Sequence, residues 1–178
     1  ILTCAAIVQS FMLIITMPLG GITSGTQTIL GYNYGAKNPE RVKGAFYLLL
    51  KASLVYSIVL WGVIILFPQV FAGIFTTDAA LLAFTKKALR IYLAAMFLFG
   101  IQISCQMAFN SLGKALCSIV VAVVRKFVLL IPLIYILPAF LQEKTSAVYM
   151  AEPVADTMAV TFTAILFFFQ FRKAMKEI

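Results

Sequence analysis

The chain has 178 residues, of which 63% are hydrophobic and 11% charged, and its mean hydropathy is +1.04. Soluble domains average roughly 45–50% apolar and about 25% charged residues, so this composition excludes a single water-soluble core. The 14 Lys and Arg against 6 Asp and Glu lie between apolar runs, which is typical of membrane-protein loops and argues against nucleic-acid binding. Without histidine or a Cys-x-x-Cys pair, the sequence predicts no cofactor, metal site or enzyme.

Five apolar stretches are each long enough to cross a bilayer, which takes about 20 residues in a helix. Open β-sheet cannot cross lipid, and no stretch alternates as a barrel strand does, so we expect helices. The sequence therefore predicts an all-α integral membrane protein, a bundle of five transmembrane helices in one domain over 1–178. Because the chain opens inside an apolar run, we expect the natural protein to be longer. The predicted helices cover residues 1–30, 45–71, 79–112, 115–141 and 147–171.

Basic residues between the stretches predict the orientation in the membrane. The larger set follows the first stretch, the third and the fifth, and the smaller set comprises Lys86, Lys87, Arg90 and Lys144. Cytoplasmic loops are enriched in Lys and Arg. We therefore expect a multi-pass protein of the cell membrane with a cytoplasmic C-terminus.

Arg125 and Lys126 lie inside the fourth apolar stretch. Long basic side chains at a helix end can extend to the interface while their stems stay in lipid. We expect this anchoring role, because a further apolar run follows them. The alternative is a pair of charges that line a cavity.

Two acidic residues lie in the fifth stretch, Glu152 and Asp156, four residues apart and so on one helix face. Ionisable groups within a membrane span suggest function by default, and such a pair could exchange protons or attract an organic cation. Glu152 has an alternative role at the extracellular helix end, where an acid suits the helix dipole and Pro153 suits the first turn. Asp156 lies deeper and is the better functional candidate.

Amide side chains form two stripes. Gln102, Gln106 and Asn110 recur at intervals of four, and Gln27 ends a similar series in the first stretch. Amides face lipid only at a cost, so we expect both stripes to point inward. They either hold helices together or line a wet cavity that binds polar parts of a ligand.

Prolines interrupt two of the predicted helices. Pro18 precedes Gly20 and Gly21 in the first stretch, and Pro132 lies in the fourth. Proline removes a backbone donor and clashes with the preceding turn, so we expect both helices to bend or unwind there. Broken helices often mark binding sites or hinges in transporters.

The segment after the first stretch reads GYNYGAKNPER from Gly31 to Arg41. This segment closely resembles the multidrug and toxic compound extrusion (MATE) family. Residues 106–114, 131–133 and 151–156 resemble that family's tenth, eleventh and twelfth helices. Glycine permits left-handed backbone and Asn-Pro favours a tight turn. We therefore expect the motif to shape a cytoplasmic turn and not to touch substrate; its residues are Gly31, Asn33, Gly35 and Arg41.

The resemblance implies a transporter of twelve helices in two lobes, of which this chain would supply helices eight to twelve, most of the C-terminal lobe. It implies a proton- or sodium-driven antiporter that exports cationic or amphipathic drugs and toxins across the cytoplasmic membrane. Its partners would be a small cationic substrate, a coupling ion, the bilayer and the missing N-terminal lobe. The sodium-coupled branch has a carboxylate in its tenth helix, where this chain has amides, so a proton is favoured over sodium.

Three rival functions differ in what they require. A lipid-linked oligosaccharide flippase of the same superfamily needs a strongly basic central cavity, whereas Arg125 and Lys126 are the only deep cations in the sequence. A channel or scaffold subunit would show no ion-coupled flux. An intramembrane enzyme would need an acid–base partner for Asp156, and the chain offers neither a histidine nor a second deep aspartate.

Overall fold

The protein was analysed as a computed structural model, which describes every residue except 1, 68–69, 71–72, 74–89, 92 and 141–143. The described residues are almost entirely helical, and they contain no strand. The all-α prediction is therefore confirmed. The helices are α1 (Leu2–Gly35), α2 (Pro39–Leu66), the short 3₁₀ helix η1 (Met96–Leu98), α5 (Phe99–Ser111), α6 (Ala115–Val123), the π-helix η2 (Val124–Leu130), α7 (Ile131–Phe140) and α8 (Lys144–Glu177).

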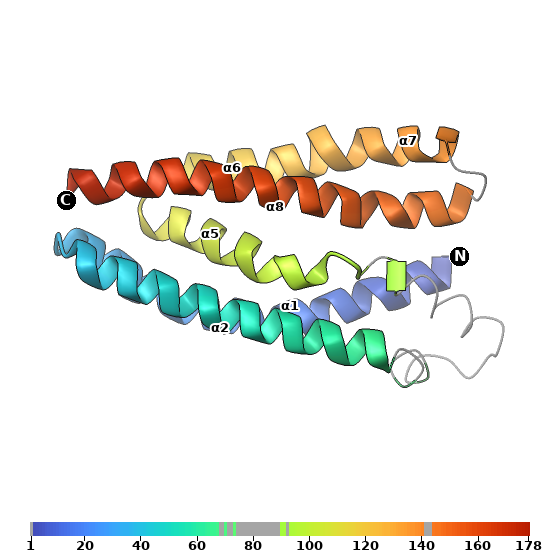
Figure 1. Ribbon diagram of the computed structural model, residues 1–178, viewed down its shortest axis with the longest axis horizontal. Coiled ribbons are helices and arrows are strands. Elements are labelled where there is room, and N and C mark those ends of the chain that lie inside the picture. The colour runs from blue at the N-terminus through green and yellow to red at the C-terminus, as the bar shows by residue number, and fades with distance from the viewer. Residues whose placement is uncertain (1, 68–69, 71–72, 74–89, 92, 141–143) are drawn as a thin grey trace.

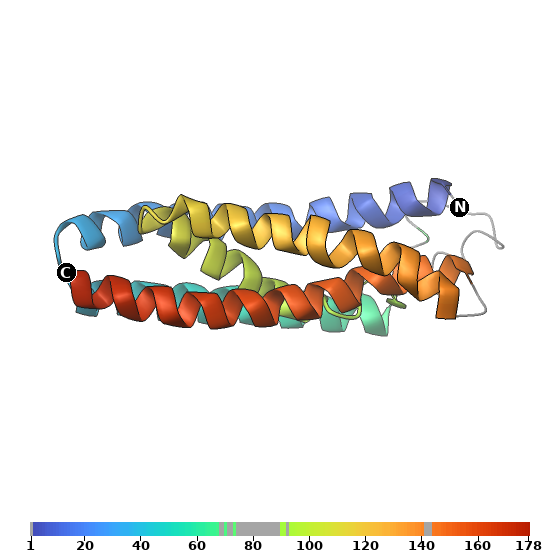
Figure 2. The same cartoon turned by 90° about the horizontal axis from the view of Figure 1, so that it is seen from above.

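The helices run nearly parallel to one long axis, in three layers (Figure 1). Helices α1 and α2 form one outer layer, α5 lies in the middle, and α8 pairs with the continuous run of α6, η2 and α7 in the other outer layer. The N-terminus lies near one end of the bundle and the C-terminus at the other, as Figure 2 also shows. Helix α5 contacts α1, α2 and α8, and so joins the two outer layers.

Three helices among the described residues are long and apolar enough to cross a membrane. They are Pro39–Leu66, Ala115–Ala139 and Met150–Glu177. Only 6% of the apolar window in Ala115–Ala139 is buried within the chain. That helix therefore presents most of its surface to whatever surrounds this chain, whether lipid, water or another part of the protein.

Helix α1 continues through Pro18, so the expected unwinding at this proline does not occur, and a bend there stays a prediction. A proline within a helix frees carbonyl oxygens in the preceding turn. The hydroxyl of Tyr56, on α2, donates a hydrogen bond to the Ile15 carbonyl oxygen at 3.1 Å. A neighbouring helix thus supplies a donor next to the proline, as membrane helices commonly do.

The fourth helix does not unwind at Pro132 either, but it changes its hydrogen-bond pattern just before it. Residues Val124–Leu130 form a π-helix, and the Ile131 N–H donates to the Lys126 carbonyl oxygen five residues earlier. A π-segment inserts one extra residue into a turn and often occurs at a functional site. Proline has no N–H to give to the preceding turn, and the wider turn accommodates that loss.

The third predicted helix differs more from its prediction. Residues 74–89, which include most of its first half, lie outside the described residues. A turn at 93–95 and the 3₁₀ helix Met96–Leu98 precede α5, which begins at Phe99. No proline or glycine marks this interruption in the sequence. Leu93 and Met96 are buried there, and Phe97 contacts the Trp61 ring of α2 with centroids 5.5 Å apart.

An aromatic cluster fixes α2, α5 and α8 at one end of the bundle. The Phe167 ring of α8 stacks on Phe46 of α2, with centroids 4.5 Å apart. It also meets Phe109 of α5 edge-on at 5.3 Å and stacks on Phe171 at 5.0 Å. Aromatic pairs at these distances contribute about 0.5–1.5 kcal/mol beyond their buried area.

Helices α2 and α5 approach closely at Gly100. A Cβ atom at this position would lie 2.6 Å from the Ser53 carbonyl oxygen, so only glycine permits this spacing. Small residues at helix contacts allow such close approach in membrane bundles.

Candidate functional site

Four charged side chains meet inside the bundle, and we call them the charge cluster: Arg125, Lys126, Glu152 and Asp156. Arg125 Nε donates to Asp156 Oδ1 at 2.7 Å. Lys126 Nζ donates to Glu152 Oε1 at 3.2 Å, and Arg125 Nη2 lies 4.0 Å from the same oxygen. The cluster therefore links η2 to α8 through two cations and two carboxylates.

The cluster is formally neutral and partly shielded. Asp156 and Glu152 are buried, with 4% and 9% of their surface exposed. The Arg125 guanidinium lies over the Phe99 ring of α5, 4.9 Å from its centroid, so a cation–π contact adds to the ion pair. A buried charge requires such partners because removing it from water is costly.

Lys126 differs from the other three members because 53% of its side chain is exposed. It lies eleven residues after Ala115 and thirteen before Ala139, in the middle of the helix that could span the membrane. At 1.5 Å per residue, each end of the span is about 17–20 Å away. A lysine side chain cannot cover that distance to an interface.

The ion pairs with Asp156 and Glu152 argue against the anchoring interpretation of Arg125 and Lys126. Both residues pair with carboxylates near the helix centre instead of extending to a helix end. The sequence interpretation measured only the apolar run that follows them. The run that precedes them, in α6, is also apolar, so they lie near the middle of the continuous helix Ala115–Ala139.

The capping role considered for Glu152 is also wrong. Helix α8 begins at Lys144, its first turn contains no acidic residue, and Pro153 lies within the helix. Glu152 is thus an interior residue two turns after the helix start. Its partner is Lys126 of η2, and not the free backbone donors of a helix N-terminus.

The rest of the polar face of α8 satisfies its hydrogen bonds locally. The Thr163 hydroxyl donates to the Ala159 carbonyl oxygen at 2.7 Å. Lys114, which precedes α6, donates to the side-chain oxygen of Gln170 at 3.1 Å and to its backbone oxygen at 3.2 Å. The Thr163 bond stays within α8 and the Lys114 contact links α8 to the start of α6, which leaves the charge cluster as the chemically distinctive part of α8.

The predicted amide stripe on α5 does not share one environment. Gln102 is buried, and neither atom of its amide has a hydrogen-bond partner among the described residues. Gln106 is partly buried and Asn110 is exposed, while Gln27 on α1 is partly buried. Their role as cavity-lining residues stays a prediction.

Gly31, Asn33 and Gly35 belong to the last turns of α1, and not to a loop. The left-handed backbone expected of the glycines occurs instead at Lys37, with φ of 53°. The Asn33 amide donates to the Ile29 carbonyl oxygen at 2.8 Å, which secures this helix end.

The turn itself follows the Asn-Pro signal. The Asn38 side chain accepts a hydrogen bond from the Arg41 N–H at 3.2 Å, and Pro39 is the first residue of α2. Asparagine before a first-turn proline is a favourable helix start. Arg41 is exposed in the first turn of α2. The motif thus joins two helices tightly.

Comparison with known proteins places this arrangement in a family. The MatE family model matches residues 1–136. The chain is 30% identical over 125 residues to an FAD transporter of Shewanella oneidensis, covering 70% of this chain and 27% of that protein. It is 23% identical over 152 residues to a probable multidrug resistance protein NorM of Thermotoga maritima, covering 85% of this chain and 32% of that protein.

A solved structure of the MATE multidrug transporter DinF-BH is similar in both sequence and fold. It is 32% identical, with a TM-score of 0.85, and the match covers 96% of this chain and 37% of that one. The chain thus spans about a third of the length of the relatives that it matches. The family resemblance seen in its sequence is confirmed, and the chain belongs to the MatE family of multi-pass membrane transporters.

Proposed function

We propose that this chain forms part of an ion-coupled antiporter that exports cationic or amphipathic small molecules, and that its charge cluster lines the transport path. The observation that carries the proposal is the exposed Lys126 side chain near the middle of the apolar helix Ala115–Ala139. A charged group there is costly against acyl chains, and such residues face a water-filled cavity or the bundle interior. In the complete transporter the exposed side of η2 would therefore border a water-filled cavity or the polar interior between the lobes.

The cluster offers a mechanism for coupling. Asp156 is held by Arg125, so a proton or an organic cation that binds Asp156 competes with the guanidinium for the same oxygens. Occupation of Asp156 would free Arg125 to strengthen its contact with Glu152, which already lies 4.0 Å away. The cluster then has two arrangements, a neutral one with Asp156 paired to Arg125 and one that carries an extra positive charge with Asp156 occupied, and such a pair of states can act as a switch between two transporter conformations.

Family membership supports the transport function and argues against an enzyme. The relatives named above include a probable multidrug resistance protein and a multidrug transporter. A proton is favoured over sodium as the coupling ion, because both carboxylates of the cluster already have cationic partners. The complete transporter would pair this lobe with a second one, with the C-terminus of α8 on the cytoplasmic side.

A second candidate substrate class is an anionic dinucleotide. The relative with 30% identity is an FAD transporter, and the exposed Lys126 could contact a diphosphate. Next to Lys126 in sequence, the Arg125 guanidinium lies over the Phe99 ring. An aromatic base could pack against this pair. The present pairing of both cations with carboxylates favours a cationic or amphipathic substrate instead.

Thiol labelling tests the water-lined path directly. In the transporter carrying this sequence, with its native cysteines replaced, Lys126→Cys should react with a membrane-impermeant charged thiol reagent, and an exported substrate should slow the reaction. Val55→Cys is the matched control, because Val55 lies in the middle of α2 and is 63% exposed on an apolar surface. Equal, negligible labelling of both cysteines would overturn the proposal, and protection by FAD but not by an organic cation would select the second substrate class.

A further inference from the structure

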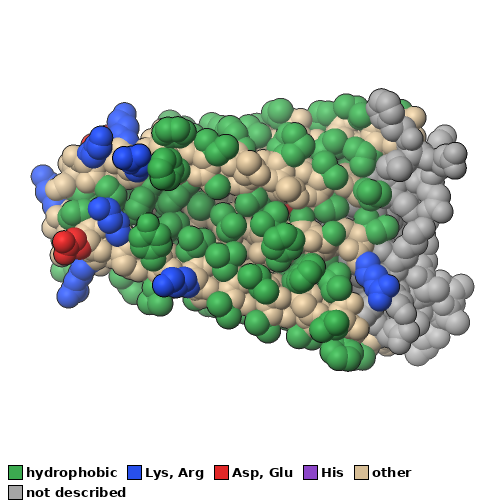
Figure 3. Space-filling view, in the orientation of Figure 1, with side chains coloured by type: hydrophobic (Ala, Val, Ile, Leu, Met, Phe, Trp, Pro, Cys, Tyr) green, Lys and Arg blue, Asp and Glu red, His purple; other side chains and the backbone are tan. Residues whose placement is uncertain are grey.

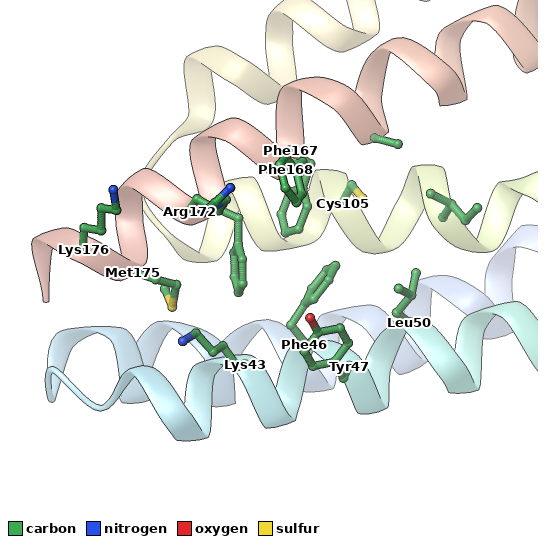
Figure 4. Close-up of a pocket in the computed structure, with 13 residues that line it drawn as sticks. Lys43, Phe46, Tyr47, Leu50, Cys105, Phe167, Phe168, Arg172, Met175 and Lys176 are labelled. Carbon is green, nitrogen blue, oxygen red and sulfur yellow. The ribbon is translucent and has the colours of Figure 1, made fainter.

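A cavity of about 480 Å³ opens between the start of α2 and the end of α8, with α5 as its floor (Figure 4). Its volume is within the range of about 300–1,000 Å³ that is usual for small-molecule sites. Its wall is largely apolar and includes five aromatic rings, namely Phe46 and Tyr47 from α2 and Phe167, Phe168 and Phe171 from α8. The interior is therefore suited to an apolar chain and not to a water-soluble ion.

The same cavity carries three cations. Lys43 lies on the α2 wall, while Arg172 and Lys176 lie on the α8 wall (Figure 4). None of the three makes an ion pair with the residues that the structure describes. Within that part of the chain, no Asp or Glu lines the cavity. The groove thus combines an apolar interior with uncompensated positive charge.

The surroundings of the groove indicate where its occupant comes from. Figure 3 shows Lys and Arg side chains gathered at this end of the molecule, with a largely hydrophobic surface beyond them. Beside the groove, Leu48 and Phe169 are exposed at 70% and 66%. Exposed apolar surface of this kind suits lipid better than water, and a ring of Lys and Arg marks the headgroup depth in membrane proteins, so the charge and the apolar wall together fit a lipid as the occupant.

We propose that this groove binds an anionic phospholipid. One acyl chain lies among the aromatic rings of α2 and α8, and the phosphate contacts Lys43, Arg172 and Lys176. Basic pockets between transmembrane helices bind anionic headgroups in this way. A zwitterionic lipid would leave the positive charge unbalanced, and a free phosphate would leave the apolar interior unused. The groove is distinct from the charge cluster, because none of the four residues of that cluster lines it.

Lipid binding can be measured on the purified transporter that carries this chain, in nanodiscs with equal amounts of phosphatidylglycerol and phosphatidylcholine. In one sample only the phosphatidylglycerol is spin-labelled, and in a second sample only the phosphatidylcholine. We expect the immobilised fraction to favour phosphatidylglycerol by about fivefold or more, since each basic residue near a headgroup contributes roughly 1 kcal/mol. The triple variant Lys43→Gln, Arg172→Gln, Lys176→Gln should lose this preference.

The matched control is Lys37→Gln, Arg41→Gln, Lys173→Gln, which removes the same charge from the same end of the molecule but from residues that do not line the groove. It should keep most of the preference. Equal loss in both triple variants would show a general attraction of the basic surface for anionic lipid and would overturn the proposal. Displacement of the lipid by soluble glycerol phosphate would also overturn it, because that result indicates a site for a free anion.

Photo-crosslinking gives a second measurement that needs no substitution. A phosphatidylglycerol with a photoactivatable group in its acyl chain should label wild-type peptides that contain Phe46 and Phe167 to Phe171. Labelling confined to the outer faces of α2 and α8, without these residues, would contradict an acyl chain in the groove.

Discussion

Arg125 Nε and Asp156 Oδ1 lie 2.7 Å apart, and they join two helices whose residues are 31 positions apart in sequence. Arg125 lies near the middle of the apolar helix Ala115–Ala139 and Asp156 lies within the apolar span of α8, where neither charge is tolerated alone. The pair therefore constrains how η2 packs on α8. The Phe99 ring on the other side of the guanidinium limits where Arg125 can move.

Breaking this pair should destabilise the bundle. Asp156→Asn and Arg125→Gln each leave one buried charge with a weaker partner, and loss of one member of a buried pair costs about 3–5 kcal/mol. We expect the lower end of that range for Asp156→Asn, because Glu152 stays within 4.0 Å of Arg125. The double variant should lose much less than the sum of the single losses. Reversible unfolding in mixed micelles measures the free energy of unfolding of all three variants. If the loss in the double variant equals the sum of the two single losses, Arg125 and Asp156 do not pair directly.

The contact between α2 and α5 depends on Gly100. Gly100→Ala places a Cβ atom 2.6 Å from the Ser53 carbonyl oxygen, so the helices must separate, at a cost of about 1–3 kcal/mol. Gly62→Ala is the matched control, because a Cβ atom there meets nothing within 4 Å. It should be neutral or stabilising by up to about 1 kcal/mol, through helix propensity. Similar unfolding free energies for the two variants would show that α2 and α5 are not so close.

Phe167 should be the most sensitive aromatic residue of α8. Its ring contacts Phe46, Phe109 and Phe171, and replacing a buried phenylalanine with alanine costs about 3–5 kcal/mol. Phe169→Ala removes the same atoms from a side chain that is 66% exposed, so it should cost much less. Thermal denaturation in detergent compares the two variants. A larger loss for Phe169→Ala would place the core on the other side of α8.

Apolar length and charge spacing predict the number of helices and the all-α class, because lipid permits few other solutions. The positions of Glu152 and Asp156 on one helix face were also predictable, since residues four apart are neighbours on a helix. The partners of these two carboxylates could not be predicted. Pairing with Arg125 and Lys126 depends on how α8 packs against η2, and that is a tertiary property.

The wrong predictions have a common physical cause. Pro18 and Pro132 indicate a missing backbone donor, but the sequence does not show that Tyr56 reaches the Ile15 carbonyl oxygen or that a π-segment precedes Pro132. The lipid groove was missed for a related reason. Its cations, Lys43 and Arg172, were counted as orientation signals, and only the fold brings them to one cavity.

Gradient-driven efflux is the most direct test of the charge cluster in transport. Proteoliposomes with the transporter carrying this sequence would be loaded with a fluorescent organic cation and given a proton gradient. We expect efflux by the wild type and by Glu177→Gln, which removes an exposed carboxylate from the same helix. Asp156→Asn, reconstituted at equal density and correctly assembled, should lose coupled efflux. Full proton-driven efflux by Asp156→Asn would contradict a role for the charge cluster in transport.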